Sequence, residues 1–408
     1  MKNKILKLLF VCFLIGLNNE ILAQQGHVFK GTFEDCKKQA AKENKMILVD
    51  LYFEGCMPCK EMDDKVFPDP EVVKVLEPNF LLYKTDVFKE EDGKKLARKY
   101  AASGFPTYVI LDASGKAILI EAGFFGVRRF VPLLEKARKL KSAGTFLAFD
   151  TDMDKKYPDA YNYRFMRSGE KGDGASLTSF LQGKDLLDEV SFVSSTMVNS
   201  PEITNRIYDN LPQFLEKYGS SLLMNPVNRA AEQRIEAFGK AQQLDSFHQT
   251  LKHIRPVYNE RLWSVFLPNL VRSYYKGSKN AEVYLSLASQ YEIFPSWAHR
   301  SNALGEIIID QKDNPTFLKK LKEEYATAFK TGKSDITDAY KLSLICAYLG
   351  DFQEAKSVSE ALVDEKLPYQ FLAIKKEDVD ALRTAITNKK LTGFQAKDVK
   401  KPIGFTMD

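Results

Sequence analysis

Two cysteines, Cys56 and Cys59, lie three positions apart in the stretch FEGCMPCKEM, residues 53–62. Thiols at this spacing can form a redox couple, a structural disulfide or half of a zinc site, or the spacing can be accidental. A zinc site is disfavoured because the chain has five cysteines, four histidines and no second C-x-x-C motif. A structural disulfide is disfavoured because closing so short a loop gains little. We therefore interpret the pair as a redox couple, with no metal bound.

The residues on either side of the pair predict its place in the fold. The apolar, β-branched run 46–53 is typical of a buried strand, and a charged helical stretch follows it. Cys56 then begins a helix, where unpaired backbone N–H groups and the helix dipole stabilise a thiolate and lower the thiol pKa. Cys59 lies one turn further on and is expected to be more buried. Cys56 is therefore predicted to attack a substrate disulfide, and Cys59 to resolve the mixed disulfide, which leaves a Cys56–Cys59 disulfide.

The first third of the chain alternates helical and strand patterns, and we assign residues 24–142 to one domain. The predicted helices and strands are, in order, helix 33–45, strand 46–53, helix 56–67, helix 71–78, strand 79–87, helix 91–103, a strand hairpin over 106–124 and helix 127–142. This order predicts an α/β fold in which helices cover both faces of a mixed sheet.

The rest of the chain differs from this domain in composition and in hydrophobic periodicity. Residues 143–176 are rich in glycine and charge and are predicted to form a linker or an irregular segment. Residues 177–408 are helical in period, with breaks at Gly239, Gly277, Lys312 and Gly350. Breaks roughly 34–40 residues apart are typical of stacked helical hairpins, and the unit LGDFQEA (349–355) resembles a tetratricopeptide repeat. We expect an all-α helical-repeat domain, with an irregular helical domain as the alternative.

The N-terminus has the layout of a secretory signal peptide, residues 1–23. A short basic region precedes an apolar run over 5–17, and cleavage is expected after Ala23. The apolar run is shorter than the roughly 20 residues that a membrane span needs, although an uncleaved signal anchor is the alternative. The mature protein is therefore expected in the periplasm or outside the cell, with no membrane span.

Composition excludes some functions and leaves two further cysteines to explain. The net charge is only +5 over 408 residues and no dense basic stripe occurs, so a nucleic-acid partner is not expected. Cys36 and Cys346 lie on apolar helical faces and are interpreted as core residues. There is no phosphate-binding loop, and Lys60 follows Cys59 where a haem-attachment motif has histidine, so no cofactor is expected.

The segment VDLYFEGCMPCK (49–60), together with GFPT (104–107), resembles the active site of the thioredoxin-like family. The closer likeness is to the periplasmic C-terminal domain of the DsbD family of disulfide reductases, through VDLY, CKEM, VFPDPEV, YKTDV and GFPT. It covers about residues 27–140 and implies a thioredoxin-like fold. Because both cysteines and the GFPT loop are intact, an inactive relic is disfavoured.

The resemblance also implies roles for two residues of the predicted sheet. Asp50 matches a buried aspartate, whose raised pKa lets it take the Cys59 proton through a water. Lys84 matches the lysine that pairs with this aspartate. The alternatives are a solvated aspartate near a strand end and an ordinary strand lysine.

The resemblance further implies a substrate-binding surface around Cys56. Pro106 would follow a cis peptide bond, and its loop would face the Cys56 sulfur. Phe105 would offer its backbone to an extended substrate segment. Met57 and Pro58, between the cysteines, would add an apolar contact surface beside the nucleophile.

Two functions of different class are consistent with these observations. The first is an exported thiol:disulfide oxidoreductase acting on client proteins, as a reductase or an isomerase, with a separate membrane-embedded or soluble thiol donor. The alternative is a helical-repeat binding or scaffold protein whose thioredoxin-like domain positions a partner without turnover. The residues between the cysteines do not fix the direction of electron flow, since related pairs range from about −270 to about −120 mV.

Overall fold

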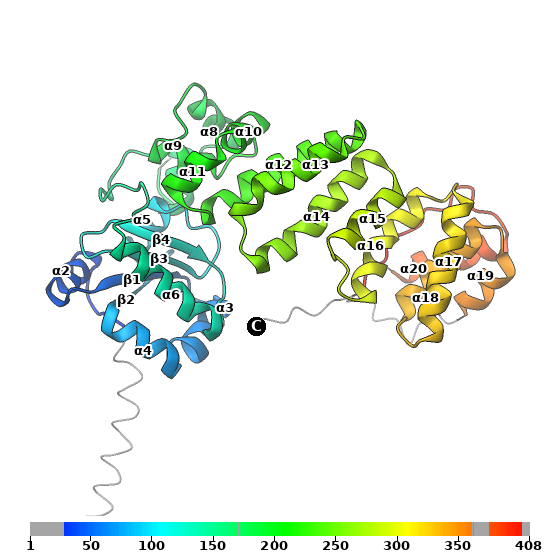
Figure 1. Ribbon diagram of the computed structural model, residues 1–408, viewed down its shortest axis with the longest axis horizontal. Helices are drawn as coiled ribbons and strands as arrows, with labels where there is room; N and C mark the ends of the chain where they lie inside the picture. The colour runs from blue at the N-terminus through cyan, green and yellow to red at the C-terminus, as the bar shows by residue number, and fades with distance from the viewer. Residues whose placement is uncertain (1–27, 170, 361, 363–374, 402–408) are drawn as a thin grey trace, which may run out of the picture. The chain divides into compact units, whose positions relative to one another are not determined.

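The computed structural model describes residues 28–169, 171–360, 362 and 375–401 (Figure 1). The predicted signal peptide and its cleavage site lie outside these residues. The chain divides into two compact units: the first runs to Ala231 and includes His253–Asn259, and the second contains Glu232–Lys252 and residues from Glu260 onward. Among the described residues, no helix combines the length and apolar character needed to cross a membrane. The domain boundaries expected from the sequence stay a prediction.

A mixed four-stranded sheet in the order β2-β1-β3-β4 forms the centre of the first unit, which confirms the predicted α/β fold. The strands are β1 (Met46–Tyr52), β2 (Phe80–Asp86), β3 (Thr107–Leu111) and β4 (Ala117–Ala122). β1 pairs in parallel with β2 and antiparallel with β3, and β3 and β4 form the predicted hairpin. Six of the seven β1 residues are buried, as a continuous apolar run requires of a strand covered on both faces.

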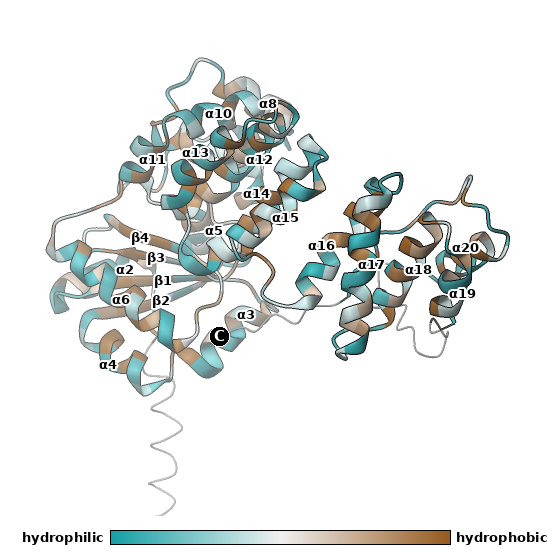
Figure 2. Cartoon of the chain, turned by 45° about the vertical axis from the view of Figure 1, so that its right-hand side comes forward, coloured by the Kyte–Doolittle hydropathy of each residue, from teal (hydrophilic) through white to brown (hydrophobic). Residues whose placement is uncertain are grey.

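Helices cover both faces of this sheet. One face carries α3 (Met57–Glu61), the π-helical turn Met62–Val66 that continues it, α4 (Pro70–Asn79) and α6 (Val127–Ser142). The other face carries α2 (Phe33–Glu43) and α5 (Glu91–Lys99). Figure 2 shows the strands as largely brown, apolar ribbons between helices that also carry teal, polar residues. The helix that begins after Cys56 is thus fixed against the sheet.

The segment 143–176, expected to form a linker or an irregular segment, belongs to the first compact unit and contains helical structure. It contains α7 (Asp159–Met166) and the start of α8 (Gly174–Leu181), and α7 lies against α5. Tyr157, Tyr161 and Phe165 are buried, and the Tyr161 hydroxyl donates a hydrogen bond to the Arg98 carbonyl. Tyr161 and Phe165, four residues apart, form the buried face of α7, and Tyr157 lies just before the helix. The helices α9 (Glu189–Ser195), α10 (Pro201–Asp209) and α11 (Leu211–Tyr218) follow.

From residue 177 onward the described part of the chain has helices and no strands, which confirms a mostly helical region. The further helices are α12 (Met224–Lys240), α13 (Leu244–Ile254), α14 (Glu260–Ser278), α15 (Ala281–Gln290), α16 (Trp297–Asp310), α17 (Pro315–Lys330), α18 (Ile336–Tyr348), α19 (Phe352–Ser359) and α20 (Lys376–Thr387). Gly239 and Gly277 lie in the last turns of α12 and α14, where a Cβ would clash with the backbone of the facing helix. Helix ends fall where the sequence predicts breaks, and the repeat assignment stays a prediction.

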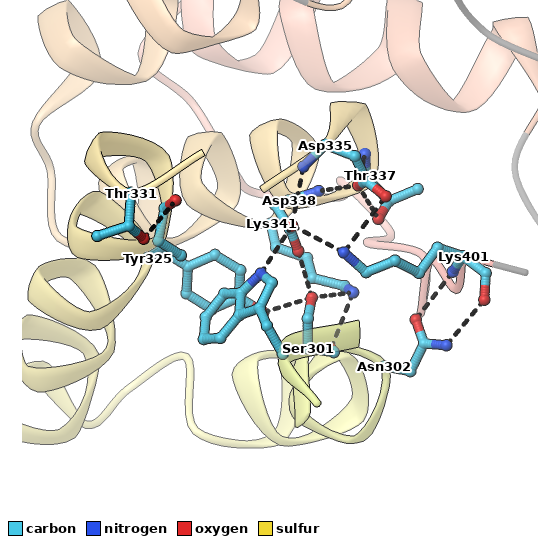
Figure 3. Close-up of polar contacts among 11 residues, drawn as sticks. Ser301, Asn302, Tyr325, Thr331, Asp335, Thr337, Asp338, Lys341 and Lys401 are labelled. Atoms are coloured by element: carbon cyan, nitrogen blue, oxygen red, sulfur yellow. Dashed lines mark hydrogen bonds and ion pairs between the residues drawn. The ribbon is translucent and has the colours of Figure 1, made fainter. Parts of the chain in front are cut away.

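A buried polar cluster joins α16 and α18 in the second unit (Figure 3). The Lys341 ammonium donates to the Ser301 hydroxyl at 2.8 Å, and Lys401 pairs with Asp338 at 2.9 Å. The Asn302 side chain exchanges two 2.8 Å hydrogen bonds with the Lys401 backbone. Burial lowers the pKa of Lys341 to about 8. Ser301 and Lys341 are fully buried, so no substrate can reach them. We therefore interpret their hydrogen bond as a structural contact between α16 and α18 and not as a catalytic pair.

Candidate active site around the cysteine pair

The cysteine pair lies at the start of α3, as the sequence predicts. Cys56 is the N-terminal cap, its sulfur accepts a hydrogen bond from the Cys59 backbone N–H at 3.3 Å, and the two sulfurs form a disulfide. Gly55 precedes Cys56 with φ of +90°, a backbone conformation that favours glycine and turns the chain out of β1 into the helix. Cys59 is 2% exposed and Cys56 is 5% exposed, so the expected difference in burial is present but small.

Asp50 lies in the middle of β1, on the face of the sheet that α3 and its π-helical continuation cover. Its neighbours in register are Lys84 of β2 and Tyr108 of β3. Side chains alternate along a strand, so Asp50 shares a face with Leu48, which packs in one core cluster with Met62. Asp50 is fully buried, in contrast to the solvated alternative.

Lys84 pairs with Asp50, with 2.9 Å between the ammonium and a carboxylate oxygen. It also pairs with Asp63 of the π-helical turn, a partner that the sequence reasoning did not identify. The ammonium lies 5.1 Å from the centre of the Tyr52 ring and 5.2 Å from that of Phe67. Lys84 therefore connects the buried carboxylate of β1 to the helix that carries the cysteines.

The electrostatics of this group raise the pKa of Asp50 above its ordinary value. Burial raises the pKa of Asp50, and the Lys84 ammonium only partly offsets this. Burial lowers the pKa of Lys84, but Asp50 and Asp63 outweigh it, and the pKa is raised overall. Neither Asp50 oxygen accepts a well-aligned hydrogen bond within the described residues, so the ion pair is its main support. A buried carboxyl with a raised pKa can exchange a proton near neutral pH.

We expect Asp50→Asn to stabilise the protein relative to wild type by an amount that grows with pH. A carboxyl whose pKa is higher in the folded than in the unfolded state costs stability as pH rises from the unfolded pKa, near 3.9, through the folded pKa. Asparagine does not ionise, and Lys84 keeps Asp63 as a partner. Urea unfolding of both proteins between pH 4 and pH 9 measures the difference. A difference that stays flat or shrinks as pH rises would contradict the assignment.

The loop that follows α5 adjoins the cysteine pair through aromatic contacts. The Phe105–Pro106 peptide bond is cis, in agreement with the resemblance. The Pro106 carbonyl accepts a 2.8 Å hydrogen bond from Gly123 N–H, which ties the loop to the end of β4. The Phe105 ring packs edge-on against Phe53, with ring centres 5.5 Å apart. Phe53 lies three residues before Cys56, so the two loops meet beside the nucleophile.

Phe53, Phe88 and Phe105 form what we call the aromatic patch. The centre of the Phe88 ring lies 5.6 Å from the centre of the Phe53 ring and 6.3 Å from that of the Phe105 ring. Phe88 is 49% exposed and Met57 is 74% exposed, which is unusual for large apolar side chains. Pro58 is exposed beside Met57. The sequence pointed to Met57, Pro58 and Phe105 but missed Phe53 and Phe88, whose place depends on how two separate loops meet.

Asp86 organises the two loops that carry the patch, and sequence reasoning gave it no role. Its carboxylate accepts hydrogen bonds from the backbone N–H groups of Glu54 (2.9 Å), Phe88 (2.8 Å) and Lys89 (3.0 Å). It is nearly buried, at the end of β2. Its position in YKTDV, at the end of a strand parallel to β1, is the signal that could have found it. Asp86 therefore fixes the turn before Cys56 relative to the Phe88 loop.

The other two described cysteines are buried and do not form disulfides. Cys36 and Cys346 are free and buried, and burial raises the pKa of each thiol to about 12. Neither forms a reactive thiolate near neutral pH. Over the described residues, no cluster of three or more histidine, cysteine, aspartate or glutamate side chains could hold a metal ion.

Comparison with known proteins agrees with this geometry. Residues 33–138 match the family described as the thioredoxin-like domain, and they form such a domain here. The chain is 32% identical over 104 residues to the thiol:disulfide interchange protein DsbD of Pectobacterium atrosepticum, covering 25% of this chain and 18% of that one. The chain is also 32% identical over 87 residues to the thiol:disulfide interchange protein DsbD of Colwellia psychrerythraea, which covers 21% of this chain and 14% of that one. The chain thus spans less than a fifth of the length of these two relatives.

Among solved structures, a thioredoxin from Thermus thermophilus is 28% identical, with 29% of this chain and 90% of that chain covered and a TM-score of 0.24.

Proposed function

We propose that this protein is a thiol:disulfide oxidoreductase that exchanges disulfides with client proteins through Cys56 and Cys59. The observation that carries the proposal is the Cys56–Cys59 disulfide at the start of α3, within a domain that matches the thioredoxin-like family. The cis-proline loop and the exposed Met57 beside the pair give a client segment a surface to contact.

The reaction transfers two electrons from the dithiol form to a client disulfide. The Cys56 thiolate attacks one client sulfur, the client S–S bond breaks, and the other client sulfur leaves as a thiolate. The Cys59 thiolate then attacks Cys56 in the mixed disulfide and releases the second client thiolate. The client ends with two thiols and the protein with its disulfide, and a dithiol donor must reduce the protein again.

Asp50 is the proposed acceptor of the Cys59 proton in the second step. It lies on the face of the sheet under the cysteine helix, and burial raises its pKa toward the range in which a carboxyl accepts and returns a proton. The Lys84 ammonium limits that rise in the pKa of Asp50. Asp50 and Lys84 form one proton-handling unit in this proposal, with Asp63 as its outer anchor.

We assign the protein to the periplasm or the cell exterior, where it acts as a reductase or an isomerase with a separate thiol donor. The predicted signal sequence and the likeness to a disulfide interchange protein support this assignment. The helical region would recruit clients or the donor. A reduction potential for the pair near about −270 mV would indicate a reductase, and one near about −120 mV an oxidant.

A trapping experiment separates the oxidoreductase from a scaffold. We expect the reduced Cys59→Ser variant to accumulate a covalent mixed disulfide with insulin, because Cys56 can attack but no thiol resolves the intermediate. Mass spectrometry would detect the adduct, and dithiothreitol would release it. The Cys56→Ser/Cys59→Ser double variant is the matched control and should form no adduct. A protein that binds a partner only noncovalently, whatever residue is at position 59, would be a scaffold.

A further inference from the structure

Helix α7 holds a fixed position beside the aromatic patch, although it lies outside the residues that match the thioredoxin-like family. The Arg98 guanidinium of α5 donates to Asn162 at 2.9 Å and to the Met153 carbonyl at 2.8 Å, and it stacks on Tyr157. Tyr161 is fully buried beneath it. The C-terminal end of α7 is therefore held in place relative to the thioredoxin-like domain.

Arg167 directly follows α7, and its guanidinium lies 5.6 Å from the centre of the Phe88 ring. Arg167 caps α7 with φ of +55°, so the chain turns there, and the residue is exposed. Phe88 in turn contacts Phe105 of the cis-proline loop. Arg167, which lies outside the residues that match the thioredoxin-like family, therefore borders the aromatic patch next to Cys56.

Of the charged residues that the structure describes around the patch, Arg167 lies against Phe88 without an ion-pair partner. Glu54 and Lys89 are exposed and pair with one another. Asp86 is buried, and its oxygens accept backbone N–H groups. No carboxylate within the described residues forms an ion pair with Arg167. A guanidinium presents planar, paired N–H donors that suit a carboxylate, and it can keep its stacking contact with Phe88 while it does so.

We infer that Arg167 is a specificity-determining residue that selects client segments with a carboxylate a few residues from the disulfide cysteine. The client segment would lie over Met57 and the aromatic patch and place its acidic side chain on Arg167. This inference rests on the proposed function, because the same cysteine pair carries out the exchange.

The test uses synthetic peptides with one cysteine in a mixed disulfide with 2-nitro-5-thiobenzoate, which is released as a coloured thiolate when Cys56 attacks. Two peptides differ only in carrying glutamate or glutamine two residues from the cysteine on each side. Their rates with dithiothreitol correct for intrinsic reactivity. For the reduced wild-type protein we expect a corrected rate ratio of roughly two- to fivefold in favour of glutamate, as an exposed ion pair allows. The ratio should fall toward one in about 1 M salt, where the Debye length is about 3 Å.

Two variants complete the experiment. Arg167→Gln should bring the glutamate-to-glutamine ratio to about one. Arg164→Gln, which changes an exposed arginine within α7, should keep the wild-type ratio. A wild-type ratio of one, or a ratio that Arg167→Gln leaves unchanged, would overturn the inference while the oxidoreductase proposal stands. If no peptide reacts with the wild-type protein, the proposed function itself has failed.

Discussion

Cys56→Ser is expected to reduce the catalysed reduction of insulin by dithiothreitol to the uncatalysed rate. A serine hydroxyl cannot form the mixed disulfide through which the exchange proceeds. We expect that Cys59 does not take over, because it lies within α3 whereas Cys56 is at the N-terminal cap of that helix. Equal concentrations of wild type and variant, followed by the turbidity of precipitating insulin chains, give the comparison.

The matched controls are the two free cysteines. Cys36→Ala and Cys346→Ala should each keep the wild-type rate, because burial raises the pKa of both thiols to about 12 and neither lies in the site. Circular dichroism confirms that each variant has folded. Wild-type activity in Cys56→Ser would remove the basis of the proposed function, and loss of activity in a folded Cys36→Ala would move the chemistry elsewhere.

The sequence predicted the sheet and the cysteine helix because their signals are local. The run MILVDLY is apolar over nearly its whole length, which only a strand covered on both faces tolerates, and Gly55 turns the chain before the helix. Asp50 was identified through the resemblance, as the match to a buried aspartate, and it is fully buried in the structure. Its ion pair with Lys84 came from the resemblance and is present in the structure.

What the sequence did not show depends on contacts between distant segments. Asp86 binds the turn before Cys56 across 32 positions of the chain, and the patch formed with Phe88 follows from that contact. The segment 143–176 looked like a linker because its buried residues are a few aromatics among many polar ones. Arg167 lies beside Phe88 because α7 packs against α5. No local pattern reveals such pairings.

The strongest of these distant contacts is the ion pair between Lys99 of α5 and Glu189 of α9. The ammonium lies 2.8 Å from a Glu189 oxygen, and both side chains are almost completely buried. Lys99 also donates to the Asp152 carbonyl at 2.8 Å, and the other Glu189 oxygen accepts the Asp150 N–H at 2.7 Å. We therefore expect Lys99→Met to cost about 3 kcal/mol in free energy of unfolding, because it leaves Glu189 buried without its main counter-charge.

A double variant shows whether Lys99→Met costs stability because Glu189 is left buried without a partner, and not only because the attraction between the two charges is lost. Lys99→Met combined with Glu189→Leu removes both charges, so it should be less destabilised than Lys99→Met alone, since no uncompensated buried charge remains. Lys38→Met breaks an exposed pair with Asp35 and should leave the unfolding transition unchanged. Urea unfolding followed by circular dichroism measures all three, and hydrogen exchange of α5 and α9 amides locates the loss in the first unit. If Lys99→Met were as stable as Lys38→Met, the segment after the sheet would not depend on this pair, and the support that α5 gives to α7 and Arg167 would rest on Arg98 and Tyr161 alone.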